Sequence, residues 1–150
     1  MKRGISSIIS TLGLILMGVV IATVVFLWFS EITGNVITIN GKNIALVCED
    51  VQIQASYSDG TLYIFNIGNV DIYEISAIIY SEGKYETKNL KSIFESWPEK
   101  GLSSGDAFSG EINFDQNTEK VVIVPVLIGK TENGKNEKYT CGDKYGERII

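Results

Sequence analysis

The hydrophobic and polar positions divide the chain into two unlike parts. From Ile5 to Phe29 no residue carries a charge, and most residues are Ile, Val or Leu. After Glu31, short segments alternate between apolar and polar residues and are separated by turn-forming residues. The first pattern predicts an apolar helix over residues 5–30, and the second is typical of β-strands. We therefore expect that helix to be followed by a β-rich head of residues 31–150.

The apolar segment is long enough to cross a membrane. Its 25 uncharged residues would span roughly 37 Å as a helix, against about 30 Å for the hydrocarbon core of a bilayer. Lys2 and Arg3 precede the segment and Glu31 follows it, so the positive-inside rule predicts a cytoplasmic N-terminus and an external head. The segment ends in Trp28 and Phe29, which suit the outer interface and differ from the small residues of a secretory cleavage site.

A basic pair and a glycine stand directly before the apolar segment. Lys2, Arg3 and Gly4 precede Ile5, which places the candidate processing site ahead of the helix. In this order the sequence resembles the archaeal type IV pilins and archaellins, whose class III signal peptide is a short basic leader ending in Gly. The resemblance implies that a prepilin peptidase cuts after Gly4, which makes residues 1–4 the leader and Ile5 the first mature residue.

The same resemblance implies a surface filament. In that family the N-terminal helices form the filament core and the heads form its outer surface, after each subunit has waited in the cytoplasmic membrane for the assembly machinery. One departure from bacterial relatives is Ile9, which stands where their fifth mature residue is glutamate. A buried pairing of that glutamate with a neighbour's N-terminus is therefore not expected.

Small residues along the helix suggest self-packing. Ser6, Ser10, Gly18 and Ala22 share a four-residue spacing that is interrupted only by Leu14, and small residues allow close approach of a neighbouring helix. The abundant Ile and Val side chains are stiff and suit either lipid or a dry bundle of helices. A single-pass anchor therefore remains the alternative to a filament core.

The head is predicted to consist of short strands. Two-residue alternation and β-branched residues indicate strands at residues 36–39, 44–47, 51–55, 61–66, 70–80, 84–87, 107–114, 120–129 and 138–141. The expected turns between them are Asn40-Gly41, Asp59-Gly60, Gly68-Asn69, Glu82-Gly83, Ser104-Gly105 and Asn133-Gly134. Together with the helix, this pattern predicts an α+β chain whose head is an antiparallel β-sandwich or small barrel of immunoglobulin-like kind.

Three places carry more specific expectations. Residues 87–97 have apolar residues at helical spacing, which predicts a short helix or an ordered loop. Pro125 predicts a sheet edge or a bulge. Residues 63–75 resemble the strand, Asn-x-Gly turn and strand of many archaeal pilin-like domains, which predicts a hairpin; a binding role for Asn66 or Asn69 is the alternative.

The two cysteines lie in the part predicted to be outside. An even number of cysteines in an exported domain favours a disulfide between Cys48 and Cys141, with a pair of free buried thiols as the alternative. Closing so long a loop would stabilise the head by about 4–5 kcal/mol in the chain-entropy model.

Composition argues against catalysis and nucleic-acid binding. The chain has no histidine, which excludes an imidazole base and His-ligated metals, and its net charge of -5 disfavours a polyanionic partner. Residues 115–119 have oxygen ligands in alternation but lack the glycine and distal glutamate of a calcium loop, so they predict a polar hairpin turn. We expect no enzymatic activity, no cofactor and no metal.

These observations predict a structural protein. The leading hypothesis is a pilin of an archaeal type IV pilus-like filament, which would have copies of itself, the membrane, a prepilin peptidase and the assembly machinery as partners. The first alternative is an archaellin of the motility filament. The second is a membrane-anchored β-sandwich binding module that does not polymerise, such as an envelope or archaellum accessory protein.

Overall fold

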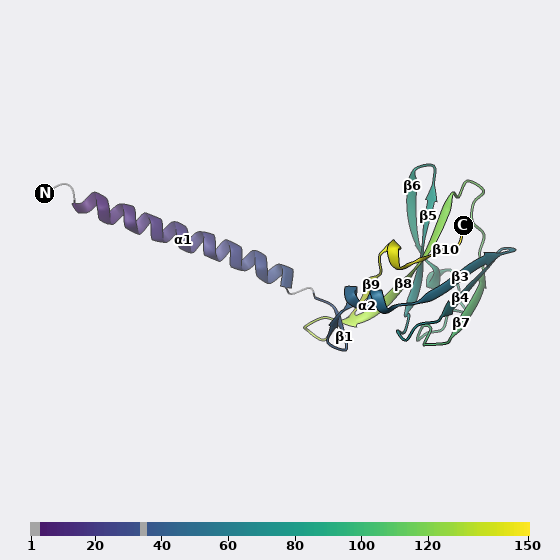
Figure 1. The fold of residues 1–150 in the computed structure, drawn as a ribbon. Coiled ribbons are helices and arrows are strands. Elements are labelled where there is room, and N and C mark those ends of the chain that lie inside the picture. Colours follow the sequence, from purple (N-terminus) through teal and green to yellow (C-terminus); the bar gives the residue numbers. More distant parts are fainter. Residues whose placement is uncertain (1–3, 34–35) are drawn as a thin grey trace. The chain divides into compact units, whose positions relative to one another are not determined.

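A computed structural model describes residues 4–33 and 36–150 (Figure 1). The chain divides into two compact units at Val36. Helix α1 (Gly4–Thr33) occupies the first unit, and antiparallel sheets make up most of the second. The chain is thus of the predicted α+β kind, and α1 extends beyond the predicted residues 5–30 at both ends.

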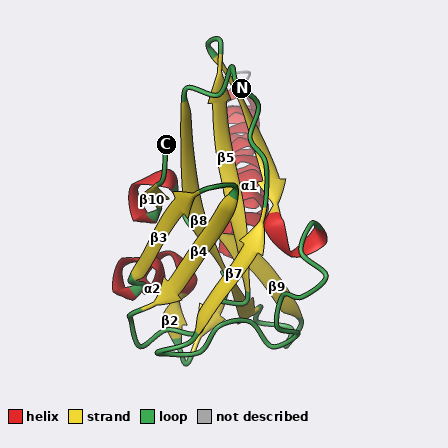
Figure 2. Ribbon diagram, turned by 90° about the vertical axis from the view of Figure 1, so that its right-hand side faces the viewer, coloured by secondary structure: helices red, strands yellow, loops and turns green. Residues whose placement is uncertain are grey.

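The described strands of the head form two antiparallel sheets. In the larger sheet the order is β2-β1-β8-β5-β6, and β9 and β10 also pair with β8. Its strands are β1 (Thr38–Ile39), β2 (Lys42–Asn43), β5 (Glu74–Ser81), β6 (Lys84–Asn89), β8 (Lys120–Lys130), β9 (Asn136–Thr140) and β10 (Glu147–Arg148). The smaller sheet has the order β3-β4-β7, with β3 (Ile53–Ser58), β4 (Thr61–Asn66) and β7 (Ala107–Glu111) (Figure 2).

One hydrophobic core joins the two sheets. Leu62 and Ile64 of β4 are buried in the same cluster as Ile75 of β5 and Val121 and Ile123 of β8. Along β4 the buried residues alternate with exposed ones, whereas β8 is buried on both faces. The alternation visible in the sequence of β4 therefore selects which of its faces points into the core, and the continuous apolar run of β8 matches a central strand.

Three of the predicted turns have the backbone that tight hairpins need. In Asn40-Gly41, Asp59-Gly60 and Glu82-Gly83, both residues have φ between 48° and 80°. Asn, Asp and Gly adopt this left-handed conformation more readily than other residues, and its twist matches that of paired antiparallel strands. These three hairpin turns are confirmed.

The strand predicted at residues 44–47 is wrong, because this segment is helical. Helix α2 (Ile44–Asp50) begins after Asn43, whose side-chain oxygen accepts a hydrogen bond from the Ala45 amide at 2.9 Å. Ile44, Val47 and Cys48 are buried, at a spacing of three and four residues. That spacing fits one helix face, so burial of this face outweighs the strand preference of a short apolar run.

The hairpin predicted at residues 63–75 is also wrong. β4 and β5 belong to different sheets, so the segment between them crosses from one sheet to the other. Asn66 holds this crossing: its amide nitrogen donates to the carbonyls of Val70 and Leu102, and its oxygen accepts from the Gly68 amide. The buried Asn66 side chain thus replaces the backbone pairing that a hairpin would have supplied.

Pro125 lies inside a strand that is paired on both edges. It is opposite Ile75 of β5, and on the other edge it falls between Ile123, which pairs with β10, and Val126, which pairs with β9. Its carbonyl accepts from the Cys141 amide, so its nitrogen faces the same gap between β9 and β10. The prediction of a sheet edge is wrong, because β8 is paired on both sides. Pro125 nevertheless costs no hydrogen bond between strands, since its nitrogen faces the gap between β9 and β10.

Residues 87–97, which are expected to form a short helix or an ordered loop, begin with the last residues of a strand. β6 continues to Asn89, and a single 3-10 turn, η1 (Leu90–Ser92), follows it. Leu90, Phe94 and Trp97 are buried in the core. A second 3-10 turn, η2 (Asp143–Tyr145), lies near the end of the head.

Candidate anchoring and assembly surface

Helix α1 offers an apolar surface that nothing in its own unit covers. Residues Ile9–Ser30, a stretch of 22 residues with a mean hydropathy of 2.7, are long and apolar enough to cross a membrane. None of this stretch is buried, and side chains such as Leu14 and Phe26 are 75% and 72% exposed. Because exposing so much apolar area to water is unfavourable, this surface requires lipid or other protein around it.

The candidate small residues do not form one straight stripe. Successive positions at a four-residue spacing turn by about 40° around an α-helix, so Gly18 and Ala22 face nearly the same way while Ser10 is turned by about 120° from Ala22. A Cβ added at Gly18 would meet no atom within 4 Å. Gly18 and Ala22 are therefore the pair in this row that one neighbouring helix can approach together.

The predicted processing residues fall at the start of the described chain. Lys2 and Arg3 lie outside the described residues. Gly4 is the first residue of α1, and Ile5 and Ser6 follow in the helix, with side chains outside the description.

Two hydroxyl groups of α1 form hydrogen bonds within the helix itself. The Thr23 hydroxyl donates to the Val19 carbonyl at 2.7 Å, and the Ser30 hydroxyl donates to the Leu27 carbonyl at 2.8 Å. Each bond stays within the helix, so these polar groups need no water. Both residues are compatible with either lipid or a dry helix bundle.

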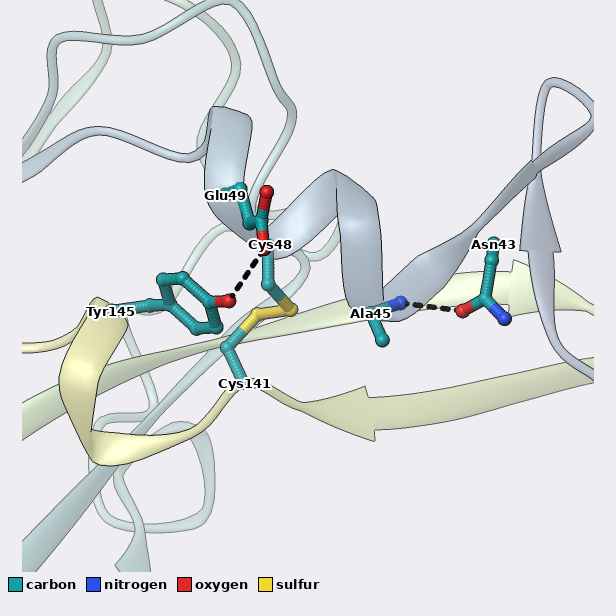
Figure 3. Close-up of a disulfide and its surroundings, with 6 residues drawn as sticks. All are labelled: Asn43, Ala45, Cys48, Glu49, Cys141 and Tyr145. Atoms are coloured by element: carbon teal, nitrogen blue, oxygen red, sulfur yellow. Dashed lines mark hydrogen bonds between the residues drawn. A yellow bond between two sulfur atoms is a disulfide. The ribbon is translucent and has the colours of Figure 1, made fainter.

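A disulfide joins α2 to the end of the large sheet (Figure 3). Cys48 and Cys141, the two cysteines predicted to pair, are bonded and almost completely buried. Cys141 follows β9, and its amide donates to the Pro125 carbonyl of β8. Beside the bridge, the Tyr145 hydroxyl donates to the Glu49 carboxylate at 3.1 Å. The bridge therefore connects α2, at the beginning of the head, to the end of β9.

A buried carboxylate connects three strands on the other face of the large sheet. Glu74 of β5 is 3% exposed, and its two oxygens each accept a hydrogen bond at 2.7 Å, from Lys138 of β9 and from Asn89 of β6. Lys91 lies 3.8 Å from the same carboxylate. The ammonium groups of Lys91 and Lys138 also lie 4.2 and 5.5 Å from the ring centre of Tyr73.

These contacts control the ionisation of Glu74. Burial by itself raises the pKa of a carboxyl group, but the hydrogen bonds from Lys138 and Asn89 and the charges of Lys138 and Lys91 outweigh burial. The pKa of Glu74 is therefore lowered, and the pKa of Lys138 is raised, chiefly by its bond to Glu74. In the sequence, the one signal for Glu74 is an acidic residue within the apolar run of a central strand.

Replacing Glu74 should weaken the head and remove part of its acid sensitivity. Because the folded pKa is lowered, the stabilisation by Glu74 is present at neutral pH and is lost as the pH falls from about 5 through the lowered pKa. Glu74→Gln should cost about 1–3 kcal/mol at pH 7, because Lys138 and Asn89 lose a charged acceptor. Melting curves at pH 7 and pH 3 should therefore differ less for this variant than for wild type.

Glu86→Gln is the matched control for this experiment. Glu86 lies on neighbouring β6, is two-thirds exposed, and pairs only loosely with Lys88 at 3.4 Å. This substitution should change stability by less than about 0.5 kcal/mol at pH 7. Equal effects of the two substitutions would contradict the assigned role of Glu74.

The other residues that the sequence suggested as binding or metal sites either stabilise the fold or lie apart from one another. The polar turn predicted at residues 115–119 is present, because the Thr118 amide donates to the Asp115 carbonyl at 2.9 Å. It does not close a hairpin, since β7 and β8, which it connects, belong to different sheets. Asn66 is buried and engaged at both ends of its amide, whereas Asn69 is exposed. Within residues 4–33 and 36–150, no three acidic or cysteine side chains lie together as a metal site requires.

No protein-family model matches the chain, and no curated protein matches it. Function is therefore inferred from the N-terminal sequence and from the surfaces described above.

Proposed function

We propose that this chain is the subunit of an archaeal type IV pilus-like surface filament. Its helices would form the filament core and its heads the outer surface, with each subunit held in the cytoplasmic membrane before assembly. The observation that carries the proposal is the exposed, uncharged surface of α1 over Ile9–Ser30. Such a surface suits lipid first and copies of the same helix afterwards.

The head fits the same proposal. Two antiparallel sheets around one core suit an immunoglobulin-like β-sandwich, which is the arrangement we propose for residues 37–150. A disulfide and a buried carboxylate with a lysine partner brace this head. A head braced by a disulfide suits a subunit exposed outside the cell.

A membrane-anchored binding module is the second candidate. The exposed apolar surface over Ile9–Ser30 supports it as well, because lipid alone can cover that surface. Electron microscopy of cell-surface material from cells that express the full chain separates the two. Filaments that contain this chain would support its role as a filament subunit. Full-length protein that stays in the membrane without forming filaments would support the membrane-anchored binding module.

Processing gives an independent test of the N-terminal sequence. The mature protein from surface material should begin at Ile5, as measured by intact mass or N-terminal sequencing. Gly4→Val should leave almost all of the protein uncleaved, because its branched side chain crowds the position next to the cut bond. Ser6→Ala, which lies just past the cut, is the control and should be processed normally. Assembled protein that still begins at Met1 would contradict the leader assignment.

A further inference from the structure

The outer face of the smaller sheet carries two exposed aromatic side chains in its central strand. Tyr63 and Phe65 of β4 alternate with the buried Leu62 and Ile64, and are 39% and 42% exposed. The register of the sheet surrounds them with small or neutral residues. Ser56 and Ser109 lie opposite Tyr63, and Gln54 and Ala107 lie opposite Phe65. We refer to these six residues as the aromatic face.

The aromatic face lacks charge in a strongly charged domain. All acidic residues except Glu31 and all basic residues except Lys2 and Arg3 fall within residues 37–150, which gives 17 acidic and 11 basic residues and a net charge of -6. None of these charges lies on the aromatic face. The nearest one in the sheet register is Glu111, opposite Thr61 at the end of the sheet. By contrast, half of the residues of exposed strand β6 are charged.

The distribution of charge on the head determines where a second copy can approach it. Two copies of the head repel each other over most of their surface, because each carries the same net negative charge. At the aromatic face they can approach without bringing like charges together. Depletion of charge with enrichment of aromatic residues is also the composition of the centre of protein interfaces. We propose that the aromatic face packs against the head of a second copy of this chain.

The size of the face sets the strength of this contact. The whole outer face of the sheet, with Thr61 and Glu111 at its end, offers roughly 300 Å² for three strands about 4.8 Å apart and some 20 Å long, and the aromatic face is smaller. A stable interface buries about 800 Å² on each partner. Contact between heads is therefore too weak to hold two free subunits together. It becomes effective when the helices already hold the heads close, because the local concentration is then high. The inference rests on the proposed filament.

The test places one negative charge on the aromatic face of the full-length protein. Phe65→Asp should reduce the amount of filament per cell by at least about tenfold, because the new carboxylate would be buried in the contact with a negatively charged neighbouring head. Tyr85→Asp is the matched control. Tyr85 is an aromatic residue of β6, 73% exposed, between Lys84 and Glu86. Its substitution should leave the filament amount within about twofold of wild type.

A second measurement covers the case in which Phe65→Asp misfolds. A photoreactive benzoylphenylalanine at position 65 should, on irradiation of surface filaments, give adducts of twice the subunit mass. Normal filaments with Phe65→Asp, an equal loss with Tyr85→Asp, or adducts to a different protein or to sugar would each overturn the inference and leave the filament standing. Absence of filaments from wild-type cells would overturn both.

Discussion

Reduction of the Cys48–Cys141 disulfide should lower the melting temperature of the head by roughly 15–25 °C. The two residues are 93 positions apart, so the bridge closes a long loop and removes much of the conformational freedom of the unfolded chain. In the chain-entropy model this is worth about 4–5 kcal/mol. The change is measured by calorimetry on the full-length protein in detergent, with and without reductant.

A double variant is the control for that experiment. Cys48→Ala with Cys141→Ala should melt at the lower temperature in both conditions, because it has no bridge to reduce. Both cysteines are almost completely buried, so Ala retains an apolar side chain at each position. Free thiols that can be alkylated in unreduced, folded protein would contradict the bridge.

Enlarging the two small residues of the helix should prevent assembly without preventing membrane insertion. Gly18→Leu with Ala22→Leu adds apolar volume, which lipid accommodates readily. In a close-packed helix bundle, added methylenes cost typically 1–3 kcal/mol at each contact, and the cost recurs in every subunit. We expect normal amounts of the variant in the membrane but at least about tenfold less filament by electron microscopy.

Val20→Leu with Val24→Leu is the matched control. These positions lie roughly opposite Gly18 and Ala22 around the helix, and they have the same four-residue spacing. Leu differs from Val by one methylene, so filament yield should stay near that of wild type. If the Gly18 and Ala22 variant polymerises normally, close packing at these positions is wrong. If wild-type protein never polymerises, the anchored module replaces the pilin.

The sequence pattern correctly predicts those elements that are determined by interactions between neighbouring residues. The uncharged run of α1 and turns such as Asn40-Gly41 are determined by residues next to one another, and both are found in the structure. Helix α2 was missed because four apolar residues fit either a strand or a helix. The cap at Asn43 and the shared burial of Ile44 and Cys48 settle the choice in the folded protein.

The sequence pattern cannot predict contacts between residues that lie far apart in the chain. Glu74 is paired with Lys138 and Asn89, which lie 64 and 15 positions away, and the register that brings them together is fixed only when the sheet forms. The aromatic face has the same origin. Tyr63 and Phe65 alternate visibly with buried residues, but their uncharged neighbours come from β3 and β7.

The place of the disulfide limits how far the head can be pulled open. Tension along α1 enters the head at Ile37, and β1 pairs with β8 at one described register position, Thr38 opposite Lys130. Such a pull would unzip the chain from Ile37 toward Cys48, where the covalent bond to Cys141 stops it. Eleven residues release at most about 40 Å of chain. Beyond that length the bridge passes the load to Cys141, directly after β9, so the strands of the larger sheet other than β1 and β2 lie behind a covalent bond while the subunit is stretched.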